Sequence, residues 1–513
     1  MDLRSLVLGV LLPGFTGTTA PTWLLDAARD GLAGVVLFAP NTPDVATTRA
    51  LTDSLHGAGP LLVAIDEESG DVSRLQLAAG SALPGAAALG AVDDVDLTRR
   101  TGAALGGLLT AAGIDLNLAP VLDVASEPRN PVIGVRSFGS GTSLVARHGA
   151  AFVTGLHDGG VAACGKHFPG HGATTADSHL VLPEIDVDTA VLRARDLPPF
   201  EAAAAAGLDA VMTAHVSVPA LGPAPASLEP AVTALARSLV GGEERVVVTD
   251  ALDMGAVASD GFGEACVRAL EAGADLLCLG TTVDRDDEGP FRTAVAAISD
   301  AVRSGRLDPA ALWRSVARTD GLRAGVRAHR HGAEQRIAYR EGTARATADP
   351  QQGAVHAERT MADIGAEVAR RAVRGHGRVR REGTPVLLDL RRRVNQAAGP
   401  TFPALAHALT RRRPGAHILL PAQPGAEPLA DSLAAIDVAT PVLVLTREPL
   451  ADADERSDLE AVLAARPDAV VVHGGTAGGA PPARAVVLAH GIGPANAEAA
   501  LDIVFGESDD RAP

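Results

Sequence analysis

Short runs of aliphatic and β-branched residues alternate with longer amphipathic stretches over the first 280 residues of the chain. The short runs are almost continuously apolar, as strands are when both faces of a parallel sheet are covered. Because strands and helices that alternate in this way build βα units, the pattern predicts an α/β fold with a parallel sheet. The runs expected to be strands are residues 6–12, 34–38, 60–66, 114–120, 160–167, 208–215, 245–250 and 274–280.

The stretches between these runs carry apolar residues at helical spacing. Eight strands separated by helices favour a closed (β/α)₈ barrel of the TIM type, which typically needs about 250 residues. An open, doubly wound sheet would give similar local patterns, and the number of strands distinguishes the two. The helices are expected at residues 45–57, 96–112, 144–158, 187–206, 229–240, 263–272 and 291–304.

A change of pattern after residue 306 indicates a second domain. The chain becomes helical and rich in arginine up to residue 382, and five apolar runs with intervening helices then predict an α/β sandwich. We therefore expect a catalytic barrel at 1–335, a linker and leading helix at 336–382, and a C-terminal sandwich domain at 383–513. The five runs are residues 385–390, 416–421, 441–446, 469–475 and 485–491. No glycine fingerprint for a nucleotide opens a helix of this domain, which favours a structural or substrate-shaping role.

Composition and charge limit the classes of binding partner and indicate the cellular compartment. The net charge of −17 argues against nucleic acid or an anionic membrane as the main partner. Cys164, Cys266 and Cys278 are odd in number and far apart, so they predict neither a disulfide framework nor a cofactor site and fit a reducing compartment. Residues 5–12 are too few to span a bilayer and are interpreted as the first buried strand. The protein is expected to be cytoplasmic.

Polar residues collect where the predicted strands end. Asp66, Lys166, His167, His215 and Asp250 each lie at the C-terminal end of an expected strand or one residue beyond it. In (β/α)₈ enzymes this edge carries the active site. Lys166 is also the only lysine in the chain, although every other strongly basic side chain is arginine. This coincidence predicts an active site at the carboxyl edge of the barrel.

The segment 166–179 is dense in titratable residues and contains Lys166, His167, His171, Asp177 and His179. The histidines could simply stabilise a loop, or they could bind Zn²⁺ with Asp177, although the ammonium of Lys166 would repel a dication. In a third interpretation Asp177 and His179 form an acid/base dyad. The carboxylate would then orient the imidazole and raise its pKa, which keeps it a proton donor near pH 7.

Asp250 ends the apolar run 245–250 and is followed by a second carboxylate, Asp253. A carboxylate that directly follows a strand is nearly fixed in position, as a nucleophile must be. The alternative is that Asp250 or Asp253 caps the next helix, because aspartate is a favoured N-cap residue.

At these residues the chain resembles glycoside hydrolase family 3, specifically its β-N-acetylglucosaminidase branch. The motif KHFPGHG followed by DSH and LP (166–183) is the most specific match, and residues 493–507 are similar to the end of two-domain members. The other matching motifs are PGF (13–15), IDEE (65–68), APVLDV (119–124), GVRSFG (134–139), MTAHV (212–216) and VVVTDALDM (246–254).

The resemblance implies a role for each matching residue. Asp250 matches the nucleophile, and His179 with Asp177 matches the acid/base dyad of the branch. His215 matches a pocket position. The positions that match sugar-binding residues of the family are Asp66, Arg74, Arg136, Lys166 and His167.

Two positions depart from the family pattern. Asp71 stands where the family's Asp-x-Glu-Gly-Gly-Arg motif has a basic residue, and Val135 stands where an acid often precedes Arg-Ser-Phe-Gly. Both lie near the rim of the expected sugar site, so they bear on the preference for the leaving group.

The predicted function is that of a retaining exo-glycosidase that removes β-linked N-acetylglucosamine from cell-wall or chitin-type oligosaccharides, with no cofactor and no metal. Resemblance implies recycling of peptidoglycan fragments. Because neutral His179 would not repel an anionic acceptor, inorganic phosphate could replace water, which makes the chain a phosphorylase. A family 3 β-glucosidase or β-xylosidase, a metal-dependent hydrolase and a non-catalytic sugar-binding barrel are also compatible with the sequence.

Overall fold

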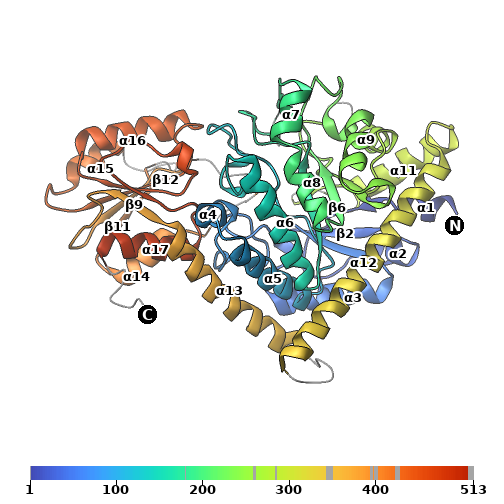
Figure 1. Cartoon of the computed structure of the whole chain (residues 1–513), viewed down its shortest axis with the longest axis horizontal. Coiled ribbons are helices and arrows are strands. Elements are labelled where there is room, and N and C mark those ends of the chain that lie inside the picture. Colours follow the sequence, from blue (N-terminus) through green and yellow to red (C-terminus); the bar gives the residue numbers. More distant parts are fainter. Residues whose placement is uncertain are drawn as a thin grey trace.

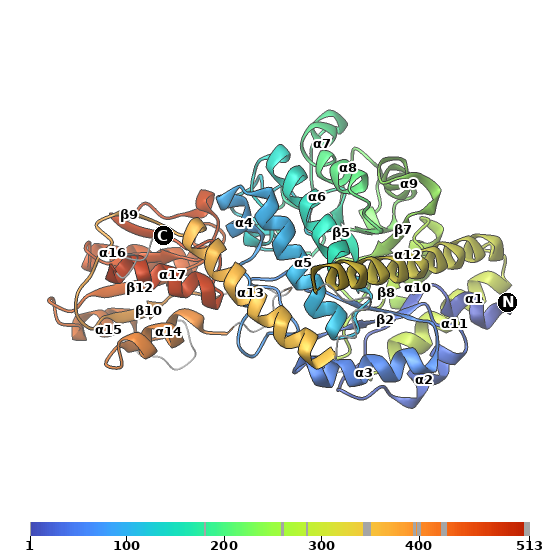
Figure 2. The same cartoon turned by 60° about the horizontal axis from the view of Figure 1, so that its bottom comes forward.

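The computed structural model describes residues 2–178, 181–257, 261–283, 286–341, 350–392, 397, 402–421 and 428–506. Figures 1 and 2 show two α/β units side by side, one coloured blue to yellow and one orange to red, with helix α13 running between them. None of the helices in the described part of the chain is long and apolar enough to cross a membrane.

The first unit contains eight parallel strands that follow one another in sequence order. Every residue in them is buried, as the continuous apolar runs predict. We call these strands the ring: β1 (Leu11–Leu12), β2 (Gly34–Leu37), β3 (Leu62–Ile65), β4 (Leu116–Asn117), β5 (Ala162–Phe168), β6 (Ala210–Thr213), β7 (Val246–Thr249) and β8 (Leu277–Cys278).

Regular ladders join β2 through β7, and a separate ladder joins β8 to β1. A bridge between Val248 and Leu276 connects β7 to the start of β8. Hydrogen bonds from Ala33 N to Leu8 O and from Val36 N to Pro13 O, each 3.0 Å, link β1 to β2. The expected α/β fold with a curled parallel sheet is confirmed.

Helices surround the ring and include three that the sequence pattern did not indicate, α1, α2 and α4. They are α1 (Leu3–Leu8), α2 (Thr22–Arg29), α3 (Val45–Ala58), α4 (Ala86–Val92), α5 (Val95–Ala111), α6 (Thr142–Asp158), α7 (Thr189–Arg195), α8 (Pro198–Ala205), α9 (Pro230–Leu239), α10 (Phe262–Glu271), α11 (Gly289–Arg303) and α12 (Pro309–Glu341). Short 3₁₀ turns lie at η1 (Ala39–Asn41), η2 (Gly134–Arg136), η3 (Ala226–Leu228) and η4 (Gly242–Glu244).

Two expected elements are wrong. The run 6–12 was expected to be one strand, but α1 occupies its first part because the side chain of Asp2 accepts a hydrogen bond from Ser5 N and caps the helix. The single helix expected at 187–206 is divided into α7 and α8. Pro198 starts α8 at its first turn, where a missing N–H costs nothing.

Helix α12 covers the N-terminal ends of the ring strands (Figure 2). Its Leu322 and Val326 belong to the apolar cluster that fills the ring, together with strand residues such as Leu62 and Met212. The guanidinium of Arg323 donates to Ala33 O at 2.7 Å. These contacts close the ring at one end and leave its carboxyl edge for the site.

The second unit is a six-stranded sheet in the order β11-β10-β12-β13-β14-β9. The parallel strands match the five expected runs: β10 (Val386–Asp389), β11 (His417–Leu419), β12 (Val442–Thr446), β13 (Val470–His473) and β14 (Ala485–Leu488). The expected number is wrong, because β9 (Arg374–Gly377) adds an antiparallel edge. All four residues of β9 are exposed, so this strand has no hydrophobic signal.

Helices flank this sheet, and separate apolar clusters fill the space on its two faces. They are α14 (Ala404–Arg412), α15 (Leu429–Ala435), α16 (Ala453–Ala465) and α17 (Pro494–Phe505), with a 3₁₀ turn η6 (Ala477–Gly479). Helix α13 (Pro350–Ala372) serves both units. Its Met361 and Val368 pack in the core of the first unit, and its Ala369 packs in the core of the second. The boundaries at 335 and 382 stay a prediction, and α12 continues past the first of them.

Candidate active site

Two predicted site residues, Asp66 and Lys166, meet at the carboxyl edge of the ring. Asp66 follows β3, and Lys166 lies near the end of β5. The Lys166 ammonium donates to Asp66 Oδ1 at 2.6 Å and lies 2.7 Å from Glu68 Oε1. Only 3% of the Lys166 side chain is exposed, so its charge is held between two carboxylates rather than by water. Burial opposes the charge, but the two carboxylates raise the pKa of Lys166 above its ordinary value.

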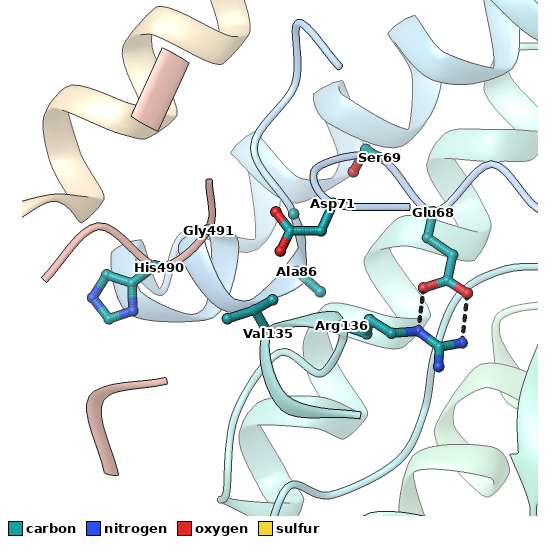
Figure 3. A pocket seen from close by; sticks show the side chains of 9 residues that line it. Glu68, Ser69, Asp71, Ala86, Val135, Arg136, His490 and Gly491 are labelled. Carbon is teal, nitrogen blue, oxygen red and sulfur yellow. Dashed lines mark hydrogen bonds and ion pairs between the residues drawn. The ribbon is translucent and has the colours of Figure 1, made fainter. Parts of the chain in front are cut away.

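Glu68 also binds Arg136 through both carboxylate oxygens, each at 2.8 Å (Figure 3). Both side chains are buried. Burial alone would raise the pKa of Glu68, but the charges of Arg136 and Lys166 hold it well below its usual range. Glu68 is therefore an ionised bridge between two cations. Glu68 was not among the site residues predicted from the sequence, although the IDEE motif contains it.

His167 extends this network to Asp123. Its Nδ1 lies 2.7 Å from Asp123 Oδ2, and its Nε2 lies 3.3 Å from the Arg136 guanidinium. Because arginine is always a donor, Nε2 accepts and Nδ1 carries the proton that goes to Asp123. Burial would raise the pKa of Asp123, but its interaction with His167, including the hydrogen bond from Nδ1, lowers it. Asp123 lies in the APVLDV motif and was likewise not predicted as a site residue.

The result is a continuous row of ion-paired and hydrogen-bonded side chains at one edge of the ring, which we call the charged row. Its members in order are Asp66, Lys166, Glu68, Arg136, His167 and Asp123. Lys166 lies between two carboxylates, and Arg136 lies between Glu68 and the His167 imidazole, so each side chain is held in one orientation before a ligand arrives. A rigid set of donors and acceptors suits a substrate with several hydroxyl groups.

The loop after β5 is anchored by Asp123 as well. His171 N donates to Asp123 Oδ1 at 2.7 Å, and the ring nitrogens of His171 contact the hydroxyls of Thr174 and Ser178 at 3.1 and 3.0 Å. Burial is the main cause that lowers the pKa of His171 to about 4. His171 is therefore neutral at pH 7 and stabilises the loop.

Asp177 lies half-buried near the end of this loop, and its carbonyl accepts from Val181 N at 3.0 Å. His179, the predicted proton donor, lies outside the described residues. The dyad of these two residues stays a prediction. Of the zinc ligands considered from the sequence, the described ones are His167, His171 and Asp177, and they do not form a group with metal-ligand spacing.

Asp250 follows β7 directly. Its N–H donates to Thr213 O at 3.1 Å, and its Oδ1 accepts from Ala251 N at 2.8 Å. Helix α10 begins much later, with Gly261 as its N-cap. The alternative that Asp250 or Asp253 caps the next helix is therefore wrong.

His215 supports the turn that carries Asp250. The imidazole of His215 is completely buried. Its Nε2 donates to Ala251 O at 2.9 Å, and its Nδ1 lies 2.7 Å from Ser227 Oγ. Both ring nitrogens are engaged within the protein. The structure gives His215 a positioning role, and the predicted sugar contact stays a prediction.

Strand register places Asp250 beside the loop after β5. Phe168 in β5 pairs with Thr213 in β6, which pairs with Thr249 in β7. Neighbouring strands lie about 4.8 Å apart, so the start of the loop and Asp250 are about 10 Å apart at one level. The Asp250 carboxylate also acts on the pKa of His171, in the direction opposite to the larger effect of burial.

Arg74 reaches toward the second unit, because its guanidinium donates to Ala397 O at 2.7 Å. Its backbone N–H donates to Glu67 Oε2 at 2.8 Å. Burial raises the pKa of Glu67, while hydrogen bonds from Leu75 N and other donors lower it less. Arg74 thus links the two units, and its predicted sugar contact stays a prediction.

A small hollow is lined by the Glu68–Arg136 pair on one side (Figure 3). Its far wall comes from His490 and Gly491 of the second unit, and Asp71 stands between the two sides. A second small hollow lies between residues 128–135 and two loops of the second unit. The second unit therefore forms part of the walls close to the charged row.

A curled parallel sheet with a rigid row of charges at its carboxyl edge is the architecture of a barrel enzyme for a polar substrate. The family model described as "Glycosyl hydrolase family 3 N terminal domain" matches residues 23–321. The chain belongs to this family and is a glycoside hydrolase, as the motifs of the sequence predict.

Known relatives agree with this assignment. "Beta-hexosaminidase A" of Pseudoalteromonas piscicida is 34% identical over 336 residues, which are 60% of this chain and 56% of that protein. The chain thus spans little more than half the length of this relative. "Beta-hexosaminidase LpqI" of Mycobacterium tuberculosis is 36% identical over 297 residues, which are 56% of this chain and 74% of the relative. The solved structure of a glycoside hydrolase family 3 β-N-acetylglucosaminidase from Paenibacillus sp. str. FPU-7 is 31% identical. It has a TM-score of 0.84 and covers 99% of this chain and 97% of its own.

Proposed function

We propose that this glycoside hydrolase removes terminal β-linked N-acetylglucosamine from oligosaccharides and retains the configuration at the anomeric carbon. The observation that carries the proposal is that Asp250 and the loop after β5 occupy one edge of the ring, beside the charged row. The names of relatives support N-acetylglucosamine as the sugar, and the solved structure among them covers 99% of this chain.

In this mechanism Asp250 Oδ attacks the anomeric carbon and forms a glycosyl-enzyme ester. His179 as imidazolium donates its proton to the leaving oxygen, and Asp177 orients it. Neutral His179 then takes a proton from water, which attacks the ester and releases the sugar. The bond from sugar to leaving group breaks in the first step, and the ester bond breaks in the second.

The charged row holds the sugar during both steps. Lys166 and Arg136 supply donors, and Asp66 supplies an acceptor, in an arrangement that His167 and the other members of the row fix beforehand. Prior orientation of the reacting groups lowers the barrier because less motional freedom is lost on the way to the transition state. Cell-wall or chitin fragments in the cytoplasm are the natural substrates in this proposal.

The test compares aryl β-N-acetylglucosaminides that have good and poor leaving groups. Asp250→Asn should abolish turnover of both, whereas His179→Ala should spare the substrate with the activated phenolate, which needs little protonation. Asp186→Asn is a matched control, because Asp186 is an exposed carboxylate that follows the same loop. Equal losses on both substrates in His179→Ala would remove the acid assignment.

The configuration of the first product tests retention independently. Proton NMR during early turnover should show the β anomer before mutarotation, and the α anomer in its place would exclude a glycosyl-enzyme. Addition of phosphate to the same reaction tests the second acceptor. Formation of N-acetylglucosamine 1-phosphate would establish phosphorolysis, and an unchanged rate without this product would leave hydrolysis alone.

A further inference from the structure

Three aspartates hold the end of the ring that is opposite the active site. Asp115, Asp209 and Asp275 lie one or two residues before β4, β6 and β8. Each carboxylate accepts the backbone N–H of a residue in the preceding strand, at 2.8, 2.9 and 2.9 Å respectively. We call each aspartate with its side-chain partners a station. Since one strand lies between successive stations, they recur at alternate positions around the ring.

Each station also binds one basic side chain from α12 and one from another helix. At Asp115 these are Arg330 at 2.7 Å and His56 at 2.8 Å. At Asp275 they are Arg318 at 3.0 Å and Arg237 at 2.8 Å. A guanidinium is always protonated and does not bind a metal ion, so these two stations serve only to fasten α12.

The station at Asp209 differs because both of its partners are histidines. His157 Nε2 lies 2.7 Å from Asp209 Oδ2, and His329 Nε2 lies 3.0 Å from Asp209 Oδ1. The two imidazole rings are stacked, with centroids 3.9 Å apart and planes inclined by 11°. Burial would raise the pKa of Asp209, but the hydrogen bonds from both histidines hold it well below its usual range. The carboxylate is therefore ionised.

We propose that His157, His329 and Asp209 bind a divalent transition-metal ion of the zinc class. Two imidazole nitrogens and a carboxylate oxygen are ligands that such an ion prefers, and a water molecule would complete a tetrahedral set. The three ligand atoms already lie within 4.8 Å of one another. Within the part of the chain that the structure describes, this is the group of histidine, cysteine and acidic side chains that has metal-ligand spacing.

Binding requires a limited rearrangement. The bonds to a tetrahedral ion diverge, so the imidazoles must turn out of their stack, and each Nε2 must give up its proton to bind. Both imidazoles can turn toward solvent, because 15% of the His157 side chain and 22% of the His329 side chain are exposed. The exposed side also provides the path by which the ion enters.

The ion would join three elements of the ring: α6 through His157, the start of β6 through Asp209, and α12 through His329. The station lies at the end of the ring opposite Asp250, so the ion stabilises the closed ring and takes no part in glycoside cleavage. This proposal is independent of the proposed function.

The test measures zinc bound to the full-length chain after removal of metal with EDTA, addition of ZnCl₂ and gel filtration. The informative variant is His329→Arg, which gives Asp209 the same kind of α12 partner as the other two stations and so keeps the attachment of α12. The matched control is His56→Ala, which removes a histidine from the station at Asp115. Thermal denaturation with EDTA checks that both variants remain folded.

We expect one zinc ion per chain in the wild type and in His56→Ala, and loss of this ion in His329→Arg and in His157→Gln. Zinc should raise the melting temperature of the wild type and leave that of His329→Arg unchanged. A wild type that retains no zinc would overturn the proposal. Retention of the ion by folded His329→Arg would overturn it equally, because the ion would then bind elsewhere.

Discussion

The carboxylate of Asp71 lies 3.3 Å from the guanidinium of Arg447, and this pair joins the two units of the molecule. Both side chains are buried, and Asp71 Oδ1 also accepts from Ile492 N at 3.1 Å. Asp71 occupies the position at which the family motif carries a basic residue. The exchange of charge therefore has a partner in the second unit and is a feature of the contact between the units.

A double-mutant cycle on Asp71 and Arg447 tests this contact. Arg447→Ala leaves the buried Asp71 carboxylate without its counterion and should cost about 2–4 kcal/mol of unfolding free energy. Asp71→Ala should cost less, because Arg447 keeps Glu448 as a partner at 3.3 Å. The double variant should be less destabilised than the sum of the two, with a coupling of about 1–2 kcal/mol. Denaturant unfolding measures all four free energies, and strict additivity would show that the pair contributes nothing.

Glu68→Gln should damage the protein more than Glu67→Gln does. Glu68 is ionised between two buried cations, and loss of its charge should cost about 3 kcal/mol of unfolding free energy. Glu67 is buried too, but burial raises its pKa and its partners include backbone N–H groups, which an amide oxygen also satisfies. Thermal melts of the two variants give the comparison, and equal losses would show that the charge of Glu68 is unimportant.

Asp123→Asn should lower kcat/KM by about 10–100-fold, because an amide does not fix His167 as the tautomer with a proton on Nδ1. Asp123 acts through His167 and His171 and is a positioning residue. The pH profile of kcat/KM should shift, which a purely structural role would not cause. Glu127→Gln is the control, since the Glu127 side chain pairs with Arg129 on an adjacent stretch of surface. An unchanged profile in Asp123→Asn would contradict the role.

Glu455→Gln should stabilise the chain at high pH. Burial raises the pKa of Glu455 to about 7, from 4.5 in the unfolded chain. The folded state therefore holds the proton more tightly, and stability falls as the pH rises from about 4.5 to 7. Glutamine keeps an acceptor for Arg447 N and removes the charge. It should gain about 1–2 kcal/mol at pH 8 and nothing at pH 4.

The control for this measurement is Glu460→Gln, because Glu460 is exposed on the same helix, α16. Denaturant unfolding at pH 4, 6 and 8 gives the three points for each variant. A gain by Glu455→Gln that is independent of pH would show that the carboxyl is ionised throughout this range.

The ring strands and most helices could be predicted because their apolar residues are continuous or regularly spaced. Strand β9 could not, since its four residues are polar and exposed and only its neighbour β14 makes it a strand. The first run was misassigned because a run of apolar residues does not distinguish a buried helix turn from a strand. In this segment the N-cap at Asp2 stabilises the helix.

The residues that could be placed at the site from the sequence are those at strand ends. Lys166 and Asp250 are examples, because the carboxyl ends of all the parallel strands meet at one edge of the ring. Glu68 and Asp123 were missed, since the role of each depends on a contact with a residue distant in the sequence, Arg136 for Glu68 and His167 for Asp123. The stations at the other end of the ring could not be predicted for the same reason, because each joins an aspartate to helix α12, which follows much later in the chain.

Helix α12 has a consequence for how the chain is made. Leu322 and Val326, which seal the interior of the ring, are translated after all eight strands. A ribosome adds about 5–20 residues per second, so several seconds pass between the emergence of β8 and that of the whole of α12. During this interval the nascent ring exposes an unsealed apolar end, and completion of the fold depends on the arrival of this one late segment.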